Sequence, residues 1–148
     1  MSEFEVDIEI GIRIEIVFRY LTNLNDTPRW YSAVKSARLV EGTGPGLGSK
    51  YEILRQLPQG RAEDIVEVTE FEPPHLFTFR TSKGATPFRY KYVLEEKNGA
   101  TVVRLHGEIS LSGGARLLSP LATQAFKRGM QSNLETLKRL LESSQPER

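Results

Sequence analysis

The sequence predicts an α+β domain in which one long C-terminal helix packs across a curved, antiparallel sheet of seven strands. Three observations carry this prediction: an alternating apolar and acidic segment at the N-terminus, six further strand-like segments in close succession, and a strongly amphipathic segment near the C-terminus. A twisted antiparallel sheet has one face to bury, and a single long helix can lie across it. One helix cannot fill the whole concave face, so we expect a cavity between the sheet and the helix.

The N-terminal part predicts a strand followed by two short helices. Acidic residues alternate with Phe4, Val6, Ile8 and Ile10, which is typical of a half-buried strand. Apolar side chains then recur at helical spacing within residues 12–24. The sequence NDTPRWYSAV predicts a break and a second short helix, with Pro28 near its start.

The middle of the chain predicts six consecutive antiparallel strands. The strand-like segments are residues 37–41, 49–56, 63–72, 76–82, 88–96 and 101–111. Most of them are separated by PQGR, EPPH, SKGAT and KNGA, each of which contains Pro, Gly or Asn-Gly and therefore favours a tight turn. Hairpins joining neighbours are the simplest arrangement.

The C-terminal segment predicts a helix over about 119–142. Ser119-Pro120 offers a cap followed by proline at the first helical position. Apolar side chains at three- and four-residue steps form one stripe, and polar side chains fill the opposite face. The stripe comprises Leu121, Ala122, Ala125, Phe126, Met130, Leu134, Leu137 and Leu141, and the polar face comprises Lys127, Arg128, Gln131, Glu135, Lys138 and Glu142. We expect residues 143–148 to be frayed.

Composition narrows the class of protein. The 148 residues fit one domain, 1–148, and a net charge of +1 provides no general attraction for nucleic acid or anionic membranes. The absence of cysteine excludes disulfides and thiolate chemistry and fits a cytoplasmic location. The acidic N-terminus is unlike a signal peptide, and no apolar run reaches the roughly 20 residues of a membrane helix. We expect a monomer or homodimer with a small-molecule partner, no nucleic acid and no integral membrane segment.

The stretch VEGTGPGLGSKYEI, residues 40–53, contains four glycines at alternate positions. A phosphate-binding loop requires two glycines five apart, then Lys and Ser or Thr, at the start of a helix. Here Ser49-Lys50 has the reverse order, and a strand-like segment follows. We therefore interpret residues 42–48 as a connection between two strands. Gating of a cavity mouth by this loop is an alternative to ordinary turn formation.

Four stretches resemble a known superfamily. They are VFRYLTNLNDTPRWYSAV, GPGLGSKYEI, EVTEFEPPHLFTFR and GATVVRLHGEI. Across the whole chain they are similar to the helix-grip superfamily, which includes the birch-pollen allergen, START lipid-transfer domains and, most similar of these, the polyketide cyclase/dehydrase proteins. The resemblance implies the helix-grip fold and one cavity that supports many functions. Relatives often begin the first helix with a small residue and proline, whereas this chain has Gly11-Ile12-Arg13.

Alternation along the strands predicts which side chains face the helix. A cavity lined by these side chains fits a lipid, polyketide, isoprenoid or aromatic ligand. The candidate ligand-binding residues are Trp30, Tyr51, Ile53, Phe77, Phe79, Phe88, Tyr90, Tyr92, Phe126, Gly129 and Met130. Plain core packing is the alternative for this set. Buried tyrosine hydroxyls require hydrogen-bond partners, which favours a partly polar cavity.

Arg55 is the most specific candidate for a functional polar residue in the cavity. A buried guanidinium is costly unless paired, so Arg55 either is exposed or anchors a carboxylate, carbonyl or enolate. A cyclase or dehydratase would use Arg55 and Tyr90 as catalytic residues to polarise a carbonyl and move protons. No His, Asp or Glu is expected to face inward, so ligand binding is favoured over catalysis. A partner-binding adaptor that uses its exposed loops is a third possibility.

No metal or organic cofactor is expected. His75 and His106 lie on different segments without the paired ligand spacing of a zinc site. His75 follows two prolines and is expected in a turn. His106 is expected on the outer face of the last strand, where it and Arg104 would pair with acidic residues of the first strand. The chain contains no G-x-S-x-G sequence, so serine nucleophile chemistry has no support.

Overall fold

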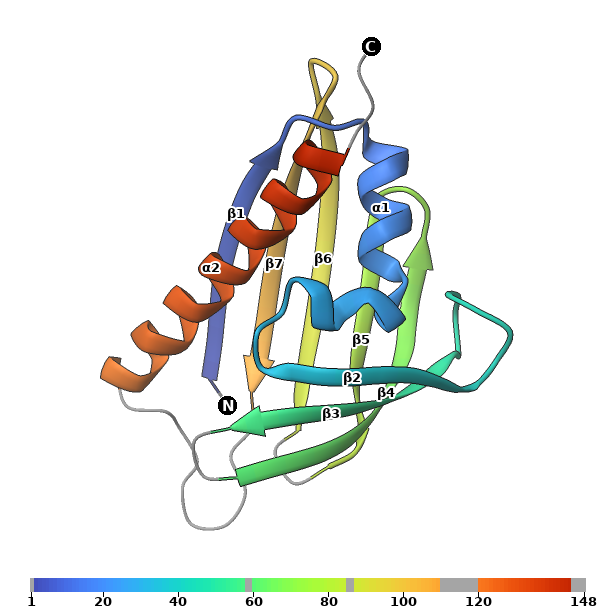
Figure 1. The fold of residues 1–148 in the computed structure, drawn as a ribbon, viewed down its shortest axis with the longest axis vertical. Coiled ribbons are helices and arrows are strands. Elements are labelled where there is room, and N and C mark those ends of the chain that lie inside the picture. Colours follow the sequence, from blue (N-terminus) through green and yellow to red (C-terminus); the bar gives the residue numbers. More distant parts are fainter. Residues whose placement is uncertain (1, 58–59, 85–86, 110–119, 145–148) are drawn as a thin grey trace.

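The structure is a computed structural model, and it describes residues 2–57, 60–84, 87–109 and 120–144. One seven-stranded antiparallel sheet wraps around a long C-terminal helix, α2 (Pro120–Ser144), as predicted (Figure 1). The strands are β1 (Ser2–Ile10), β2 (Val34–Glu41), β3 (Lys50–Leu57), β4 (Gly60–Glu72), β5 (Leu76–Lys83), β6 (Phe88–Lys97) and β7 (Ala100–Ile109). Two short helices, α1 (Ile14–Thr22) and the 3-10 helix η1 (Leu24–Arg29), follow β1.

The sheet order places the two helical layers over different parts of the same concave face. The order is β1-β7-β6-β5-β4-β3-β2, so β1 and β2 are the edge strands. Helix α2 packs against β1, whereas α1 contacts β6 and β7, and η1 packs against β2 (Figure 1). Strands β2 and β3 cross below η1 at a steep angle to β5–β7. The strong twist thus closes the sheet around α1 and η1 as well as around α2.

The predicted inner faces of the strands are confirmed by burial. The inward side chains of β6 are all buried, and the same alternation holds for β3 and β7. On β5 the predicted Phe77 and Phe79 are buried, but so is Thr78 between them. The buried residues predicted to face inward are Tyr51, Ile53, Arg55, Phe77, Phe79, Phe88, Tyr90, Tyr92, Leu94, Thr101, Val103, Leu105 and Ile109. Leu111, predicted on the same face, lies outside the described residues.

The second helical segment differs from the prediction. It is the 3-10 helix η1, and Pro28 lies next to its last residue instead of near its start. Trp30 and Tyr31 follow in a turn, where both backbone N–H groups donate to Thr27 O, at 3.1 and 2.9 Å. Pro28 lacks an N–H group, and 3-10 helices are rarely longer than a few residues, so the segment ends at Arg29. Strand β2 then begins at Val34, three residues before the predicted start.

Helix α2 buries only part of its predicted apolar stripe. Met130 and the three leucines of the stripe that follow it are buried, but Leu121 is 82% exposed, and Ala122 and Ala125 are exposed too. Figure 1 shows the N-terminal end of α2 reaching past β1, which leaves its first turns off the sheet. The helix extends to Ser144, two residues beyond the predicted end. The predicted cap Ser119 and the last four residues of the predicted tail lie outside the described residues.

Candidate functional site

A pocket lies between the short helices and the sheet. It is lined by Leu21, Leu24, Thr27, Trp30, Tyr31, Val34, Ile53, Arg55, Phe79, Phe88, Tyr90 and Tyr92. These residues come from α1, η1, the turn after η1 and strands β2, β3, β5 and β6. The free volume is about 20 Å³, which is room for about one water molecule. Side chains therefore fill most of the space that a curved sheet leaves under η1.

Six candidate ligand-binding residues line this pocket, and so does Arg55. The six are Trp30, Ile53, Phe79, Phe88, Tyr90 and Tyr92. Tyr51 and Phe77 are fully buried in the core but are not part of the lining. Sequence reasoning missed Leu24, Thr27 and Val34 as lining residues, because the path of η1 across the sheet was not predicted.

The sequence predicts that Phe126, Gly129 and Met130 of α2 line a cavity between the helix and the sheet. None of the described α2 residues is among the lining residues of this pocket. Phe126 is half-buried and packs against Phe4, with ring centroids 5.2 Å apart, and Met130 is buried in the core. Gly129 is exposed, and a Cβ built on it would meet no atom within 4 Å. The physical reason is that α2 packs mainly against β1, so only a narrow stripe of the helix is covered.

Arg55 and Asp64 form a buried ion pair beside the pocket. Arg55 Nε donates to Asp64 Oδ2 at 2.8 Å, and the guanidinium carbon lies 5.1 Å from the centroid of the Phe88 ring. The relative exposure is 9% for Arg55 and 1% for Asp64. Arg55 thus lies on the inner face, and the expectation that no acidic side chain faces inward is wrong. The sequence does contain a signal for Asp64, since it alternates with the buried Val66 and Val68 of β4.

Two tyrosine hydroxyls meet in the pocket. Tyr31 Oη and Tyr90 Oη lie 3.3 Å apart in a hydrogen bond. Burial raises the pKa of Tyr31 above its ordinary value, while the hydrogen bond to Tyr90 and the charge of Arg55 partly oppose this. Burial likewise raises the pKa of Tyr90 well above its ordinary value, and the neighbouring Tyr31 raises it further. Both hydroxyls are therefore neutral at physiological pH and can donate or accept hydrogen bonds.

The same pocket contains a buried hydroxyl without a partner. Thr27 is 5% exposed, and its Oγ1 makes no hydrogen bond within the part of the chain that the structure describes. A buried polar atom without a partner costs about 1–3 kcal/mol of stability. A ligand atom or a water molecule in the pocket would remove that cost.

The glycine-rich loop borders a different feature. Pro45 of this loop lines an open groove along α1, together with Phe18, Phe71 and the two prolines 73 and 74. No residue of 42–48 lines the internal pocket. The loop is held in place because Gly48 N–H donates to Val68 O at 2.9 Å. Gly42 and Gly48 have φ values of +106° and +84°, so turn formation accounts for these two glycines.

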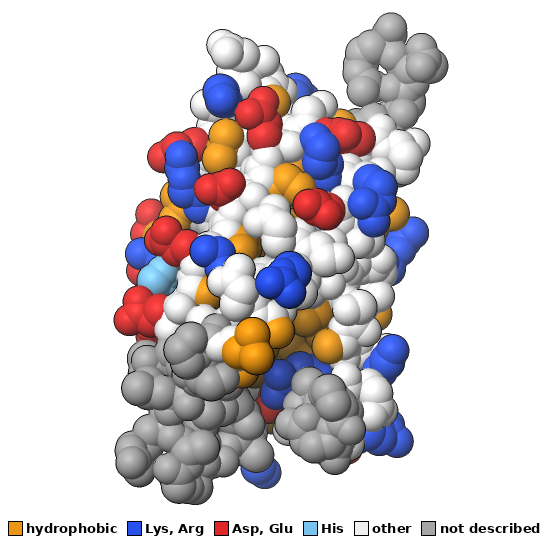
Figure 2. Space-filling model, turned by 90° about the vertical axis from the view of Figure 1, so that its left-hand side faces the viewer, with side chains coloured by type: hydrophobic (Ala, Val, Ile, Leu, Met, Phe, Trp, Pro, Cys, Tyr) orange, Lys and Arg blue, Asp and Glu red, His pale blue; other side chains and the backbone are white. Residues whose placement is uncertain are grey.

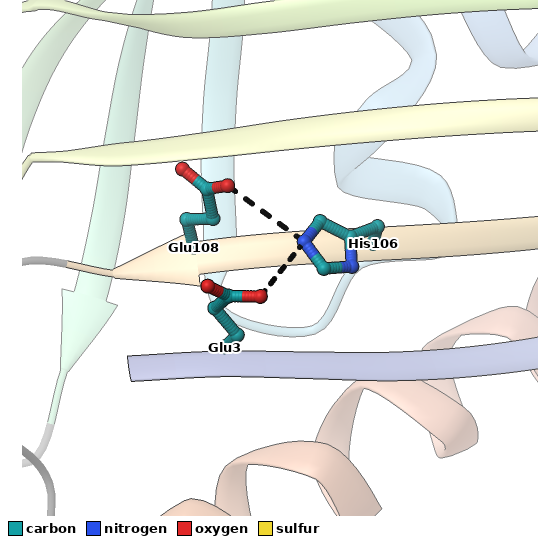
Figure 3. A group of neighbouring side chains, drawn as sticks. All are labelled: Glu3, His106 and Glu108. Carbon is teal, nitrogen blue, oxygen red and sulfur yellow. Dashed lines mark ion pairs between the residues drawn. The ribbon is translucent and has the colours of Figure 1, made fainter. Parts of the chain in front are cut away.

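His106 lies on the outer face of the sheet, as predicted, among carboxylates. Its Nε2 lies 3.3 Å from Glu3 Oε1 and 3.7 Å from Glu108 Oε2, and its Nδ1 lies 3.4 Å from Glu5 Oε2. Figure 3 shows the Glu3 and Glu108 carboxylates turned toward one imidazole nitrogen. Their ligand atoms are close enough together to hold a metal ion. Charge pairing between neighbouring strands accounts for the arrangement of these surface groups.

Arg104 lies opposite the acidic Asp7 of β1, as predicted. Its closest ion pair is with β6, where Arg104 Nη1 lies 2.7 Å from Glu95 Oε1. His75 lies in the turn before β5, as expected, with its Nδ1 3.0 Å from Leu94 O.

The surface shows no single sign of charge on the face drawn in Figure 2. Acidic and basic side chains are interspersed over the upper part of that face. Hydrophobic side chains gather in a hollow in the lower part, with Lys or Arg side chains beside them. Neither of the two α-helices that the structure describes is both long and apolar enough to cross a bilayer.

The chain has the helix-grip fold, and solved structures of low identity share that fold. A START superfamily protein from Mycobacterium smegmatis superposes with a TM-score of 0.81 at 9% identity, over 97% of this chain and 99% of that one. A protein from Thermus thermophilus gives 0.79 at 17% identity, over 97% and 100%. The major latex-like protein 151 of Panax ginseng gives 0.73 at 12% identity, over 94% and 96%.

Residues 1–142 match the model of the family described as "Polyketide cyclase / dehydrase and lipid transport". This chain therefore belongs to that family. No curated protein matches it significantly. The family is consistent with binding of a hydrophobic ligand or with cyclase-like chemistry.

Proposed function

We propose that this protein binds a small, mostly apolar molecule in the pocket between η1 and the sheet. The observation that carries the proposal is the lining, in which aromatic and aliphatic walls surround a few polar groups. These are Arg55, the Tyr31–Tyr90 hydroxyl pair and the hydroxyl of Thr27, which has no partner among the described residues. Ligand pockets in proteins commonly combine apolar walls with a small number of placed polar groups. The family match to lipid transport and polyketide cyclases supports the same conclusion.

Binding requires the pocket to open. Its free volume of about 20 Å³ is far below the roughly 300–1,000 Å³ typical of ligand sites. Of the elements that line the pocket, η1 and the turn at Trp30 and Tyr31 have the weakest backbone hydrogen bonding, because the hydrogen bonds of a 3-10 helix have poor geometry. We propose that displacement of this wall admits the ligand.

A second function, a cyclase or dehydratase, is favoured by one specific observation. Asp64 supplies an inward carboxylate paired with Arg55, and Tyr90 supplies a neutral hydroxyl. In such an enzyme Arg55 and Tyr90 would be catalytic residues that stabilise a developing oxyanion. Asp64 would be a positioning residue, because it holds Arg55 and does not itself line the pocket.

The binding proposal is tested with prodan, a neutral naphthyl ketone whose fluorescence reports an apolar environment. We expect saturable binding to the wild type and at least tenfold weaker binding to Val34→Phe, because Val34 lines the pocket and its replacement fills it. The matched control is Val93→Phe on the outer face of β6, which should bind like the wild type. Equal affinity of Val34→Phe and wild type would refute binding at this site. Native mass spectrometry of the purified protein would show whether a small molecule co-purifies.

A further inference from the structure

The charge balance of the pocket bears on the chemistry of its ligand, given the proposed function. Arg55 is the one charged residue among the described residues that line the pocket. Its charge is already balanced, because Asp64 Oδ2 lies 2.8 Å from Arg55 Nε and both residues are at least nine-tenths buried. Burial keeps the tyrosine hydroxyls neutral, since it raises the pKa of Tyr31 and Tyr90. The polar end of the pocket therefore has hydrogen-bond donors but no net charge.

The donors available to a ligand can be counted. Asp64 accepts a hydrogen bond from Arg55 Nε. The two Nη groups of Arg55 have no hydrogen bond to a side chain or backbone group of the described residues. In the Tyr31–Tyr90 pair one hydroxyl donates to the other, which leaves the second O–H to donate elsewhere. Thr27 adds a third hydroxyl without a partner among the described residues. These groups all suit an acceptor oxygen.

An anionic ligand would fit this arrangement poorly. A carboxylate placed beside Arg55 would share the guanidinium with Asp64 and bring one uncompensated negative charge into a buried site. Burying an unpaired charge is strongly unfavourable, whereas a neutral acceptor oxygen loses only the water hydrogen bonds that the donors replace. The second carboxylate oxygen, Asp64 Oδ1, already has no hydrogen-bond partner among the described residues. A further anion nearby would add repulsion without adding a donor.

We propose that the pocket selects neutral, oxygen-bearing ligands such as aromatic or polycyclic ketones and discriminates against carboxylic acids, with Asp64 as the residue that determines this specificity. Asp64 acts through its charge and through Arg55, without touching the ligand. Free fatty acids and aromatic acids are accordingly excluded as preferred ligands. Removing the Asp64 charge leaves the guanidinium uncompensated and reverses the preference.

The test compares two ligands of nearly the same shape, acetylnaphthalene and naphthoate, as competitors of prodan. We expect the wild type to bind the ketone at least about tenfold more tightly than the carboxylate at neutral pH. In Asp64→Asn the carboxylate should become the tighter ligand. The double variant Arg55→Met/Asp64→Leu, which removes both charges, should keep the ketone preference with weaker binding of both.

The control replaces the exposed carboxylate at the neighbouring position of β4, which does not line the pocket. Glu63→Gln should preserve the wild-type preference. A wild type that binds naphthoate as tightly as the ketone overturns the inference but leaves the pocket proposal standing. Failure of prodan itself to bind overturns the proposed function instead. The wild-type comparison is decisive even where Asp64→Asn does not fold.

Discussion

At the scale of residues, the proposed function gives Arg55 and Asp64 the leading part in ligand selection. A buried ion pair is weak evidence for stability, because the desolvation of both ions offsets their attraction. We therefore propose that this pair, beside a mostly apolar pocket, acts toward a ligand. Arg55 was predictable from the alternation of β3, whereas its partner depends on the register between β3 and β4, where Asp64 lies opposite Ile53. The sequence pattern alone leaves that register open.

Removing one member of this pair should destabilise the protein more than removing both. Arg55→Met leaves the Asp64 carboxylate buried without its partner, and we expect a loss of about 3–5 kcal/mol in the free energy of unfolding. The double variant Arg55→Met/Asp64→Leu should recover most of that loss. Urea denaturation of the three proteins measures this difference. Equal losses in the single and double variants would show that the charges are not coupled.

At the scale of elements, polar side chains of α2 hold the edge strand β1. Gln131 Nε2 donates to Asp7 O at 2.9 Å, and Lys138 Nζ donates to Glu9 O at 2.8 Å. Glu142 Oε2 accepts from Gly11 N–H at 2.7 Å. The sequence predicts these side chains on the solvent side of the helix, because helical periodicity does not reveal that β1 is an edge strand with free carbonyls. They cover an edge that would otherwise be available for pairing.

The Glu142 contact makes a pH-dependent contribution to stability. Its hydrogen bonds with Lys138 and with Gly11 N–H lower the pKa of the Glu142 carboxyl. The contribution is therefore present above the pKa of the unfolded chain and is lost as the pH falls through the lowered pKa of the folded state. Glu142→Gln should cost about 1 kcal/mol or less at neutral pH, since the pair is partly exposed, and nothing in strong acid.

Thermal melts of the wild type and Glu142→Gln, at neutral pH and in strong acid, measure this effect. Glu135→Gln, an exposed carboxylate on the same helix, is the matched control and should be near neutral at both. A Glu142→Gln penalty that persists unchanged in acid would contradict the assigned contact.

The exposed position of Gly129 gives a second prediction for α2. Glycine within a helix costs about 0.5–1 kcal/mol relative to alanine, and a Cβ at Gly129 meets no atom within 4 Å. Gly129→Ala should raise the free energy of unfolding by about that amount and leave prodan binding unchanged. Gly99→Ala is the contrasting variant and should destabilise, because Gly99 has a φ of +83°. Weaker prodan binding by Gly129→Ala would place the ligand under α2 after all.

At the scale of the whole molecule, the fold followed from the sequence but the position of the pocket did not. Alternating strands, turn sequences and one amphipathic helix determine a sheet gripping a helix. The helix that covers the pocket is determined by where η1 crosses the sheet and by how far α2 extends past β1. Both features depend on tertiary packing, which the sequence pattern does not reveal. We therefore expected α2 to cover the cavity, whereas η1 and the turn after it cover this pocket.

The central claim is that a ligand binds under η1, and Trp30 tests it most directly. Trp30 is the one tryptophan of the chain, is 4% exposed and lines the pocket. The ring-brominated ketone 4-bromoacetophenone quenches tryptophan fluorescence at short range, through its bromine atom and its carbonyl group. We predict saturable quenching of Trp30 at the concentrations that displace prodan, retained in Phe126→Ala and lost in Val34→Phe. Displacement of prodan without quenching of Trp30, or quenching lost in Phe126→Ala but kept in Val34→Phe, would contradict the claim.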